Sequence, residues 1–557
     1  MKTHAYLKMV LCGLLFWSFG CSSDSTDSTA PAAGETLQLE RVVIGDKSGL
    51  DRFDEVAADA VIQLDFSAEL DPATLDANIY LRRAGSRVET RIDYDGGLRV
   101  TLTPTAALTA EAEYQLVINT GLATPAGVKI FSGKVITIVT AADDGDKFER
   151  IPDEELLTLV QQQTFRYFWE GAEPTSGMTR ERTSSGATVT TGGTGFGILS
   201  MIVAAERGFV TREEACSRIQ KIVTFLSERA TSYHGAFAHW INGETGVTIP
   251  FSADDNGADL VETAYLFQGL LTARTYFDGA GEEATLREGI TRLWEAVEWD
   301  FFTKEGTEKA LYWHWSPDKG WAMNLPVQGW NESLIVYVLA ASSPTHNIDA
   351  GVYDQGWARN GAILNGKMFY DTKLPLGEDY GGPLFLSHYS FLTLDPNRLS
   401  DKYADYGEQV RAHATINYRY CVDNPKGYTG YGADCWGLTA SDVDNGYSAS
   451  SPTNDLGVIA PTAALASMPY LPEESMAALH YFYYKLGDRL WSDYGFIDAF
   501  NLTTGWYDSG MHIAIDQGPI IVMIENYRSG LIWRLFMSDS EVLNGLQRLG
   551  FTVASAE

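Results

Sequence analysis

The spacing of hydrophobic residues changes once along the chain, near residue 150. Before that point, apolar and polar residues alternate in short runs, for example at residues 61–66 (VIQLDF), 99–102 (RVTL) and 114–118 (YQLVI). Such alternation is typical of strands with one buried face. Turn residues such as those at 95–97 (DGG) separate the runs at short intervals. The pattern predicts a small β-sandwich over residues 37–142.

After residue 152 the apolar residues recur every three to four positions, which predicts helices. Loops rich in glycine, aromatic residues, asparagine and aspartate separate these segments. This alternation predicts a closed ring of helix pairs over residues 153–557, joined to the sandwich by a linker over residues 143–152. We expect helices over residues 153–170, 194–207, 211–230, 257–278, 283–302, 330–341, 401–419, 457–468, 473–486, 518–534 and 540–549.

The N-terminus has the pattern of an export signal. Lys2 and Lys8 precede an apolar run over residues 9–17, and Gly20-Cys21 follows shortly after it. This resembles a bacterial lipoprotein signal over residues 1–21, in which Cys21 receives the lipid. The polar residues 22–36 are predicted to form a flexible tether. We therefore expect an exported, monomeric lipoprotein, periplasmic or at the outer membrane or cell surface, which meets the membrane only through its lipid anchor.

Charge and composition narrow the partners. The formal net charge of −32 argues against nucleic acid and anionic membrane surfaces, because both would be repelled. Aromatic residues make up 12% of the chain, including 14 Trp and 28 Tyr. Flat rings match the apolar face of a sugar, although a large domain also buries such rings in its core. A neutral carbohydrate ligand fits both observations.

The cysteines offer no metal site. Cys12 lies in the signal and Cys216 is expected to be a buried helix residue, while Cys421 and Cys435 could form a disulfide or remain two free thiols. No CxxC or HExxH motif occurs, so no zinc site is predicted. An EF-hand frame through Gly257 places unsuitable residues at both ends of the loop. We expect neither a metal nor another cofactor.

The stretch at residues 254–268 (DDNGADLVETAYLFQ) is the strongest candidate for chemistry. Read as a helix from Gly257, it puts Asp259 and Glu262 on one face, with Asp255 placed to cap the first turn. An acidic first turn can also simply complement the helix dipole. Other segments add acidic, aromatic and glycine residues at 311–332, 381–391, 428–455 and 515–530.

These segments together resemble a known family. The matching stretches are 163–169 (QTFRYFW), 177–182, 194–197, 259–263, 329–332, 342–346, 382–385 and 515–526. They are similar to the glycoamylase-like domain of glycoside hydrolase family 144, which contains bacterial β-1,2-glucanases. Residues 66–75 resemble a bacterial Ig-like module.

The resemblance implies an (α/α)6 toroid over residues 153–557. It also implies anomer-inverting hydrolysis of β-1,2-glucan, either internally or with release of sophorose. In that family an Asp-x3-Asp-x2-Glu set and a later Glu matter for activity, and these positions fall on Asp255, Asp259, Glu262 and Glu332.

Spacing limits which carboxyls can form the catalytic pair. Cβ atoms of Asp259 and Glu262 on one helix face would be roughly 5–6 Å apart. An inverting acid and base need about 6.5–9.5 Å between their carboxyls. We therefore expect Glu262 as general acid and a water-activating partner from another element, either Glu332 or Asp516.

Further residues are expected to contact the sugar. Trp313, Trp315, Trp330, Tyr431 and Trp436 are expected to wall the subsites, with plain core packing as the alternative. Arg180 and Arg182 would bind sugar hydroxyls or pair with the acids. The other expected contacts are His314, Asn331, Asp434, Asp455 and Gln517.

Two rival functions stay open at this point. One is hydrolysis of another glucan linkage, because toroids host many specificities. The other is a non-catalytic surface lipoprotein that binds glycans, which would not need the four acids at their spacing.

Overall fold

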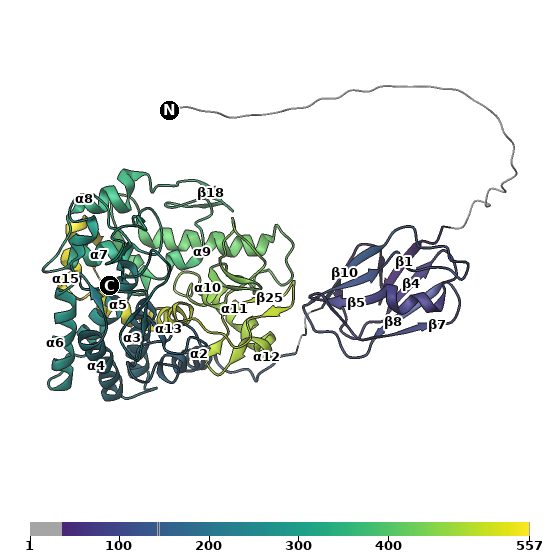
Figure 1. The fold of residues 1–557 in the computed structure, drawn as a ribbon, viewed down its shortest axis with the longest axis horizontal. Coiled ribbons are helices and arrows are strands. Elements are labelled where there is room, and N and C mark those ends of the chain that lie inside the picture. Colours follow the sequence, from purple (N-terminus) through teal and green to yellow (C-terminus); the bar gives the residue numbers. More distant parts are fainter. Residues whose placement is uncertain (1–35, 142, 144, 556–557) are drawn as a thin grey trace, which may run out of the picture.

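The computed structural model describes residues 36–141, 143 and 145–555 (Figure 1). The predicted signal peptide with Cys21, and the predicted tether up to residue 35, lie outside these residues. The described chain forms an N-terminal β-domain and a larger helical domain (Figure 1). Within this part of the chain, no helix combines the length and the apolar character needed to cross a bilayer.

The N-terminal domain is a sandwich of two five-stranded sheets. In β4, Ile62, Leu64 and Phe66 are buried between the sheets while Gln63 and Asp65 are not, so the predicted alternation is confirmed. One sheet has the order β2 (Lys47–Gly49), β1 (Leu39–Ile44), β4 (Ile62–Phe66), β8 (Arg99–Pro104) and β7 (Thr90–Tyr94). The other has the order β3 (Arg52–Val56), β10 (Lys134–Thr140), β9 (Glu113–Ile118), β5 (Ile79–Arg83) and β6 (Ser86–Arg87).

The helices of the second domain are of two kinds. Four are buried on nearly every side: α3 (Thr191–Glu206), α5 (Leu260–Tyr276), α7 (Leu334–Ser342) and α13 (Ala514–Ser529). Others bury one face only, as α4 (Arg212–Glu228), α6 (Glu282–Glu295) and α15 (Ser540–Leu549) do. Helix α3 packs against α5 and α13, α15 packs against α7, and α2 (Asp153–Trp169) packs against α13. The buried helices therefore form an inner layer that the amphipathic ones cover.

Several helix boundaries differ from the predicted ones for local reasons. The helix predicted over 518–534 is two helices, α13 and α14 (Leu531–Phe536), because Gly530 adopts a left-handed conformation with φ of 65° between them. The helix predicted over 401–419 is α9 (Tyr406–Asp423), capped by the side chain of Asp405. The helical domain also contains α8 (Ala350–Val352), α10 (Pro461–Leu465), α11 (Pro472–His480) and α12 (Gly487–Leu490), and the short α1 (Leu75–Asn78) belongs to the sandwich.

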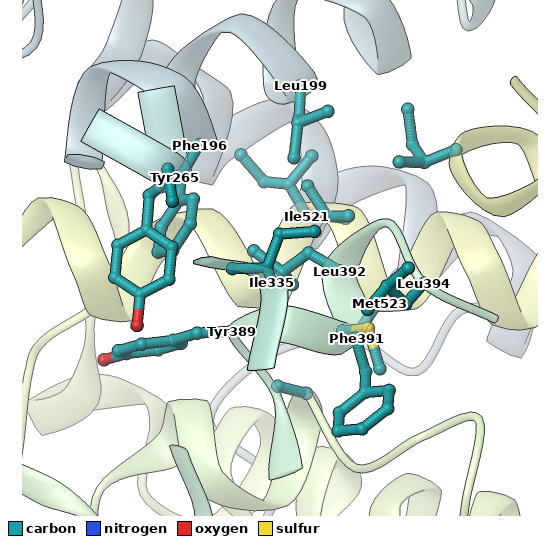
Figure 2. Packing of buried hydrophobic residues seen from close by; sticks show 14 of the residues in the cluster. Phe196, Leu199, Tyr265, Ile335, Tyr389, Phe391, Leu392, Leu394, Ile521 and Met523 are labelled. Carbon is teal, nitrogen blue, oxygen red and sulfur yellow. The ribbon is translucent and has the colours of Figure 1, made fainter. Parts of the chain in front are cut away.

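Glycines let α3 and α5 approach closely. A Cβ atom on Gly195 would lie 1.9 Å from the carbonyl oxygen of Tyr265, and one on Gly269 would lie 2.3 Å from that of Gly195. The crossing fixes the start of α5 beside the start of α3. Figure 2 shows the core around it, with side chains from α3, α5, α7, α13 and residues 389–394 packed together. The hydroxyl groups of Tyr265 and Tyr389 point out of this cluster on the same side (Figure 2).

The two domains touch at the end of the helical domain that carries α12 and β25 (Phe500–Asn501) (Figure 1). The hydroxyl of Tyr481 donates to the carboxylate of Glu111, and Arg489 donates to the carbonyl of Ala110 at 3.5 Å. Nearby, Cys421 on α9 and Cys435 are buried free thiols, as is Cys216 on α4. The disulfide considered from the sequence is therefore absent from the described chain.

Candidate active site

The first turn of α5 is organised by Asp259. Its Oδ1 accepts hydrogen bonds from the backbone N–H groups of Val261 and Glu262 at 3.0 and 2.9 Å. The predicted start at Gly257 with Asp255 as the cap is therefore wrong: the helix begins at Leu260 and Asp259 is its N-cap. The cap leaves the second oxygen of Asp259 free for other partners.

Two histidines contact this acidic cluster. A short pairing of Ala258–Asp259 with His314–Trp315 sets His314 Nε2 3.3 Å from Asp255 Oδ2 and 3.6 Å from Asp259 Oδ2. His239, which the sequence did not single out, places Nδ1 3.1 Å from Asp259 Oδ2 and Nε2 3.9 Å from Glu262 Oε1. His314, which was predicted to contact the sugar, thus lies beside the acids, together with His239.

The carboxylate of Glu262 is held from the start of α3. Its Oε2 accepts from the backbone N–H of Gly192 at 2.7 Å and from the Thr190 hydroxyl at 3.1 Å. A Cβ atom on Gly192 would lie 2.6 Å from that oxygen, so only glycine fits there without a shift. We call Asp255, Asp259, Glu262, His239 and His314 the α5 wall.

The histidines set the charge of the α5 wall. Burial would lower the pKa of His239, but Glu262 and Asp259 raise it to about 9. Burial would raise the pKa of Asp259, but the hydrogen bond from His239 and the nearby His314 lower it below its usual value. Burial raises the pKa of Asp255 to about 6, and His314 and His239 oppose this shift; burial also raises the pKa of Glu262, and His239 opposes that shift.

Glu332 lies in the turn before α7, not in the helix predicted to begin at residue 330. Its backbone carbonyl accepts from the Ser390 and Tyr265 hydroxyls, which fixes the main chain. Within the described residues, no other side chain donates a hydrogen bond to its carboxyl group. Burial, aided by the charges of Asp259 and Glu262, raises the pKa of Glu332 to about 7.

A second acidic group surrounds Asp516, which lies in the first turn of α13 rather than before it as predicted. The backbone N–H of Asp442 donates to Asp498 Oδ2 at 2.7 Å, and carboxylate oxygens of Asp442, Asp498 and Asp508 lie within 4.8 Å of one another. Arg182 donates to Asp442 at 2.8 Å. We call these four aspartates and Arg182 the α13 wall.

Three carboxyls of the α13 wall, those of Asp498, Asp508 and Asp516, resist ionisation. Burial raises the pKa of both Asp498 and Asp508 to about 7. Burial and the neighbouring Asp498 raise the pKa of Asp516 well above its usual range, while Arg182 opposes the shift. Across the described chain, no N–H or hydroxyl donor reaches either carboxyl oxygen of Asp516.

Tyrosines connect the two walls. Tyr389 is 5% exposed and its hydroxyl has no hydrogen-bond partner among the described residues. Burial raises its pKa well above 10, as do Asp516 from one wall and Glu332 beside the other, so its hydroxyl is within electrostatic reach of both. The hydroxyl groups of Tyr265 and Tyr389 leave the core on the same side (Figure 2). Tyr447 on β22 (Gly446–Ala449) is 49% exposed, and burial of its hydroxyl together with the charge of Asp516 raises its pKa.

Aromatic side chains lie beside the α5 wall. The ring of Phe251 is 4.4 Å from that of His239 and 4.7 Å from that of Trp240, centroid to centroid, and Phe251 is 49% exposed. Trp313 and Trp315, both predicted, are half-buried next to His314. Phe251 and Trp240 were not predicted, because nothing in their spacing relates them to Asp259.

Some predicted sugar contacts are structural instead. Trp436 is fully buried against Tyr418, and Trp330 is stacked between Phe391 and Tyr406, so the prediction that they wall open subsites is wrong. Both rings are core residues, the alternative that the sequence had left open.

Polar residues predicted to bind sugar also have internal partners. Arg180 donates to the carbonyls of Gly171 and Gly186. Asp455 accepts from the hydroxyls of Tyr420 and Tyr431. Three others lie as follows: Asn331 accepts from the Ser333 N–H, Gln517 donates to the Phe496 carbonyl, and Asp434 is exposed. Of these, only Gln517, next to Asp516, adjoins either wall.

Two groups of side chains have ligand atoms close enough to consider a cation: Asp255, Asp259 and His314, and Asp442, Asp498 and Asp508. In the first group both histidines already face the carboxylates, and in the second Arg182 and a backbone N–H occupy oxygens. Because these donors take the places of a metal, we assign neither group as a metal site.

Comparison with known proteins relates both domains to described families. The family model described as "Putative glucoamylase" matches residues 324–540, and that of a bacterial Ig-like domain matches residues 49–136. An exo β-1,2-glucooligosaccharide sophorohydrolase (non-reducing end) of Parabacteroides distasonis is 47% identical over 419 residues, 71% of this chain and 58% of that protein. This chain thus spans less than two thirds of the length of that relative.

Two solved structures are similar. The endo-β-1,2-glucanase of Chitinophaga pinensis, with sophorotriose and glucose, is 50% identical with a TM-score of 0.71, over 72% of this chain and 99% of that one. A β-1,2-glucanase of Parabacteroides distasonis is 39% identical with a TM-score of 0.70, over 92% of this chain and 73% of that one. The chain therefore belongs to the glycoamylase-like family of bacterial β-1,2-glucanases, glycoside hydrolase family 144, and carries a bacterial Ig-like domain before it.

Proposed function

We propose that this protein is a glycoside hydrolase that cleaves β-1,2-glucan or its oligosaccharides inside an (α/α)6 toroid. The observation that carries the proposal is the pair of acidic walls, with Tyr389 close enough to Asp516 and to Glu332 for both carboxyls to raise its pKa. Glycoside hydrolysis needs two carboxyls that flank the bond, one protonated and one ionised. The substrates named for the similar proteins are β-1,2-glucans and their oligosaccharides. The two-layer packing of helices supports the toroid.

Glu332 is the general acid in this proposal. With a pKa of about 7, it keeps its proton in part of the population near neutrality, which suits a group that protonates the leaving oxygen. Burial also raises the pKa of Glu262, the expected acid from the sequence, but Glu262 accepts two hydrogen bonds that favour its ionised form, whereas no side chain donates to the Glu332 carboxyl within the described residues. The assignment therefore moves from Glu262 to Glu332, and Glu262 becomes part of the binding wall.

Asp516 is the general base. It belongs to the opposite wall, as an inverting mechanism requires, because a water must fit between the base and the sugar. Its oxygens accept no hydrogen bond from an N–H or hydroxyl group of the described residues, so they are free to accept one from that water. Proton transfer from water to Asp516 would accompany attack at the anomeric carbon, while Glu332 gives its proton to the departing sugar oxygen.

The α5 wall and its aromatic residues would hold the sugar. Ionised Asp259 and the cationic His239 offer charged hydrogen bonds to hydroxyl groups, and the Glu262 carboxyl adds a further polar contact. Phe251, Trp313 and Trp315 offer partly exposed ring faces beside them. These contacts would orient the ring without taking part in proton transfer.

The cellular location of the protein is also part of the proposal. The sequence at residues 1–21 supports export as a lipoprotein anchored at Cys21, with residues 22–36 as a tether. We propose that the exported protein is a monomer. The Ig-like domain, which lies against the end of the helical domain, would then space the active site from the membrane.

The test is hydrolysis of β-1,2-glucan, followed by reducing-sugar release and by NMR of the first anomer formed. We expect wild-type activity with inversion, and a fall in kcat of about 10³-fold in Glu332→Gln and in Asp516→Asn. Glu262→Gln should raise KM more than it lowers kcat. The matched control is Glu282→Gln, an exposed acid in the first turn of α6, which should leave activity unchanged.

Each alternative has its own outcome. Cleavage of another glucan in a linkage panel, with β-1,2-glucan untouched, would contradict the substrate. Binding of glucan without any product would identify a glycan-binding lipoprotein. Full activity of Glu332→Gln would overturn the role of Glu332.

A further inference from the structure

We propose that Tyr389 is a substrate-binding residue whose buried hydroxyl donates a hydrogen bond to an oxygen of the glucose unit that is cleaved. The inference rests on the proposed function, because it places the sugar between Glu332 and Asp516. It adds to the site a hydroxyl group that neither proton transfer uses.

The hydroxyl of Tyr389 is buried without a partner. The residue is 5% exposed, and its hydroxyl makes no hydrogen bond to any residue that the structure describes. A buried hydroxyl without a hydrogen bond destabilises a folded protein, so such groups are uncommon and need an explanation. A ligand that binds during function is one explanation, and a trapped water is the other.

Other buried tyrosines in the helical domain use their hydroxyls inside the protein. Tyr265 donates to the carbonyl of Glu332 at 3.3 Å, and Tyr353 donates to the carboxylate of Asp401 at 2.6 Å. Among the described residues, Tyr389 is the one tyrosine whose hydroxyl is fully buried and unpaired. The missing partner is therefore particular to this position and is not a general property of the core.

Neighbouring aromatic rings fix the direction of this hydroxyl. The ring centroid of Tyr389 lies 5.3 Å from that of Phe196, 5.7 Å from that of Tyr265 and 5.1 Å from that of Phe385. Figure 2 shows the hydroxyls of Tyr265 and Tyr389 leaving the core on the same side. Because the ring is already ordered, a hydrogen bond from it to a ligand loses little side-chain entropy.

The main chain beside Tyr389 is tied to that of Glu332. The hydroxyl of the next residue, Ser390, donates to the carbonyl of Glu332 and accepts from the N–H of Ile335 at 3.1 Å. The hydroxyl of Tyr265, whose ring packs against Tyr389, donates to the same carbonyl. One neighbour in sequence and one in space thus place Tyr389 beside the proposed general acid.

The same ring lies near the start of α13. Phe196, which packs against Tyr389, covers Gly518, where a Cβ atom would lie 2.5 Å from the Cβ of Phe196. Gly518 follows Asp516 by two residues in α13. In agreement with this position, burial raises the pKa of Tyr389, and the charges of Asp516 and Glu332 raise it further. A sugar held between acid and base therefore meets this hydroxyl.

The chemistry of the hydroxyl suits a neutral sugar oxygen. A phenol with a raised pKa keeps its proton and acts as a donor, and the oxygens of a glucose ring are neutral acceptors. In glycoside hydrolysis, hydrogen bonds to sugar hydroxyls strengthen as the ring distorts toward the transition state. The bond from Tyr389 would therefore contribute to kcat/KM, and the sugar would supply the partner that the hydroxyl lacks.

The experiment compares Tyr389→Phe with wild type on β-1,2-gluco-oligosaccharides over a range of pH. We expect kcat/KM to fall by about 10- to 100-fold, because a sugar oxygen then loses its donor in a buried site. Both limbs of the pH profile should stay in place, since the hydroxyl bonds to the sugar and to neither carboxyl. The Tm should stay the same or rise, because phenylalanine removes an unpaired buried hydroxyl.

Binding is measured apart from catalysis in the Glu332→Gln background. Titration calorimetry with the same oligosaccharides should give a Kd about 5- to 10-fold higher when Tyr389→Phe is added. The matched control is Tyr353→Phe, which removes a buried hydroxyl that has a partner, Asp401. This control should lower Tm by about 1–2 °C and leave both kcat/KM and Kd unchanged.

The outcomes separate this inference from the proposed function. Unchanged kcat/KM and Kd in Tyr389→Phe overturn the inference while leaving the hydrolase in place, and a lowered Tm would then identify a trapped water as the partner. A shifted pH limb also overturns it, because the hydroxyl would then act on a carboxyl. Wild type that binds without hydrolysis refutes the hydrolase, and the Kd comparison still decides the role of Tyr389. Wild type that neither binds nor hydrolyses refutes both.

Discussion

The two acidic walls of the site differ in how their charge is compensated. In the α5 wall, Asp259 and Glu262 accept hydrogen bonds from backbone N–H groups and face two histidines. In the α13 wall, four aspartates share one arginine, and no hydrogen-bond donor among the described residues reaches the Asp516 carboxyl. The first wall therefore balances its carboxylates with histidines and backbone N–H groups, whereas three carboxyls of the second wall have raised pKa values.

This difference matches the two tasks that hydrolysis requires, orienting the sugar and accepting a proton from water. Groups that orient a sugar act best when their dipoles and charges are fixed beforehand. A base must change its protonation in every cycle, so its surroundings must tolerate both states. Aspartate can take both roles, orienting the sugar and acting as the base, because its neighbours differ in the two walls. The pKa of Asp259 is lowered and that of Asp516 is raised.

Among the substitutions that test how the two walls compensate charge, the largest effect is expected from removing His239 of the α5 wall. His239→Ala leaves Asp259 and Glu262 facing each other without their shared cation, so one of them takes up a proton and the wall loses its fixed charge. We expect kcat/KM on β-1,2-gluco-oligosaccharides to fall by about 10²-fold.

The matched control for that change is His346→Ala. His346 also pairs with a carboxylate, Asp300, but both side chains are substantially exposed. An equal loss in both variants, or a loss below about threefold in His239→Ala, would show that fixed charge in the α5 wall does not matter.

A smaller effect is expected when Arg182, the cation of the α13 wall, is substituted. Arg182 lowers the pKa of Asp516, so Arg182→Met raises it further. Since the base must be ionised, the acidic limb of the pH profile should move to higher pH, and activity on that limb should fall by about tenfold. Arg182→Lys keeps the charge and should restore most of the limb position. A limb that stays in place in Arg182→Met would separate Arg182 from the base.

The sequence revealed one wall much better than the other. Asp255, Asp259 and Glu262 lie within eight positions, so helical spacing alone brings them together. Asp442, Asp498 and Asp516 are spread over more than seventy positions on a hairpin, a loop and a helix. Only Asp516 was singled out, since contacts between distant loops leave no period in the sequence.

The fold shows the same limit. The strand pattern and the positions of the long helices followed from hydrophobic periodicity, because burial of one face sets that period. The break at Gly530 and the start of α5 at Leu260 depend on single capping residues, which the periodic pattern does not resolve. Trp436 was misassigned for a related reason, since an aromatic ring in a loop can face either core or cleft.

The smallest expected effect is on stability, and it has opposite signs in the two walls. The pKa of Asp508 is raised to about 7, so its contribution to stability is present below the unfolded pKa of about 4 and is lost as pH rises through 7. Asp508→Asn removes that loss and should raise Tm by about 1–2 °C near pH 8, with no gain near pH 5.

Asp259 has a lowered pKa, so its stabilisation is present above the unfolded pKa of about 4. Asp259→Asn, in which asparagine can still cap α5, should therefore lower Tm near pH 8. Thermal unfolding of both variants beside Asp444→Asn, a control at an exposed aspartate, measures this, and shifts of the same sign would remove the distinction between the walls.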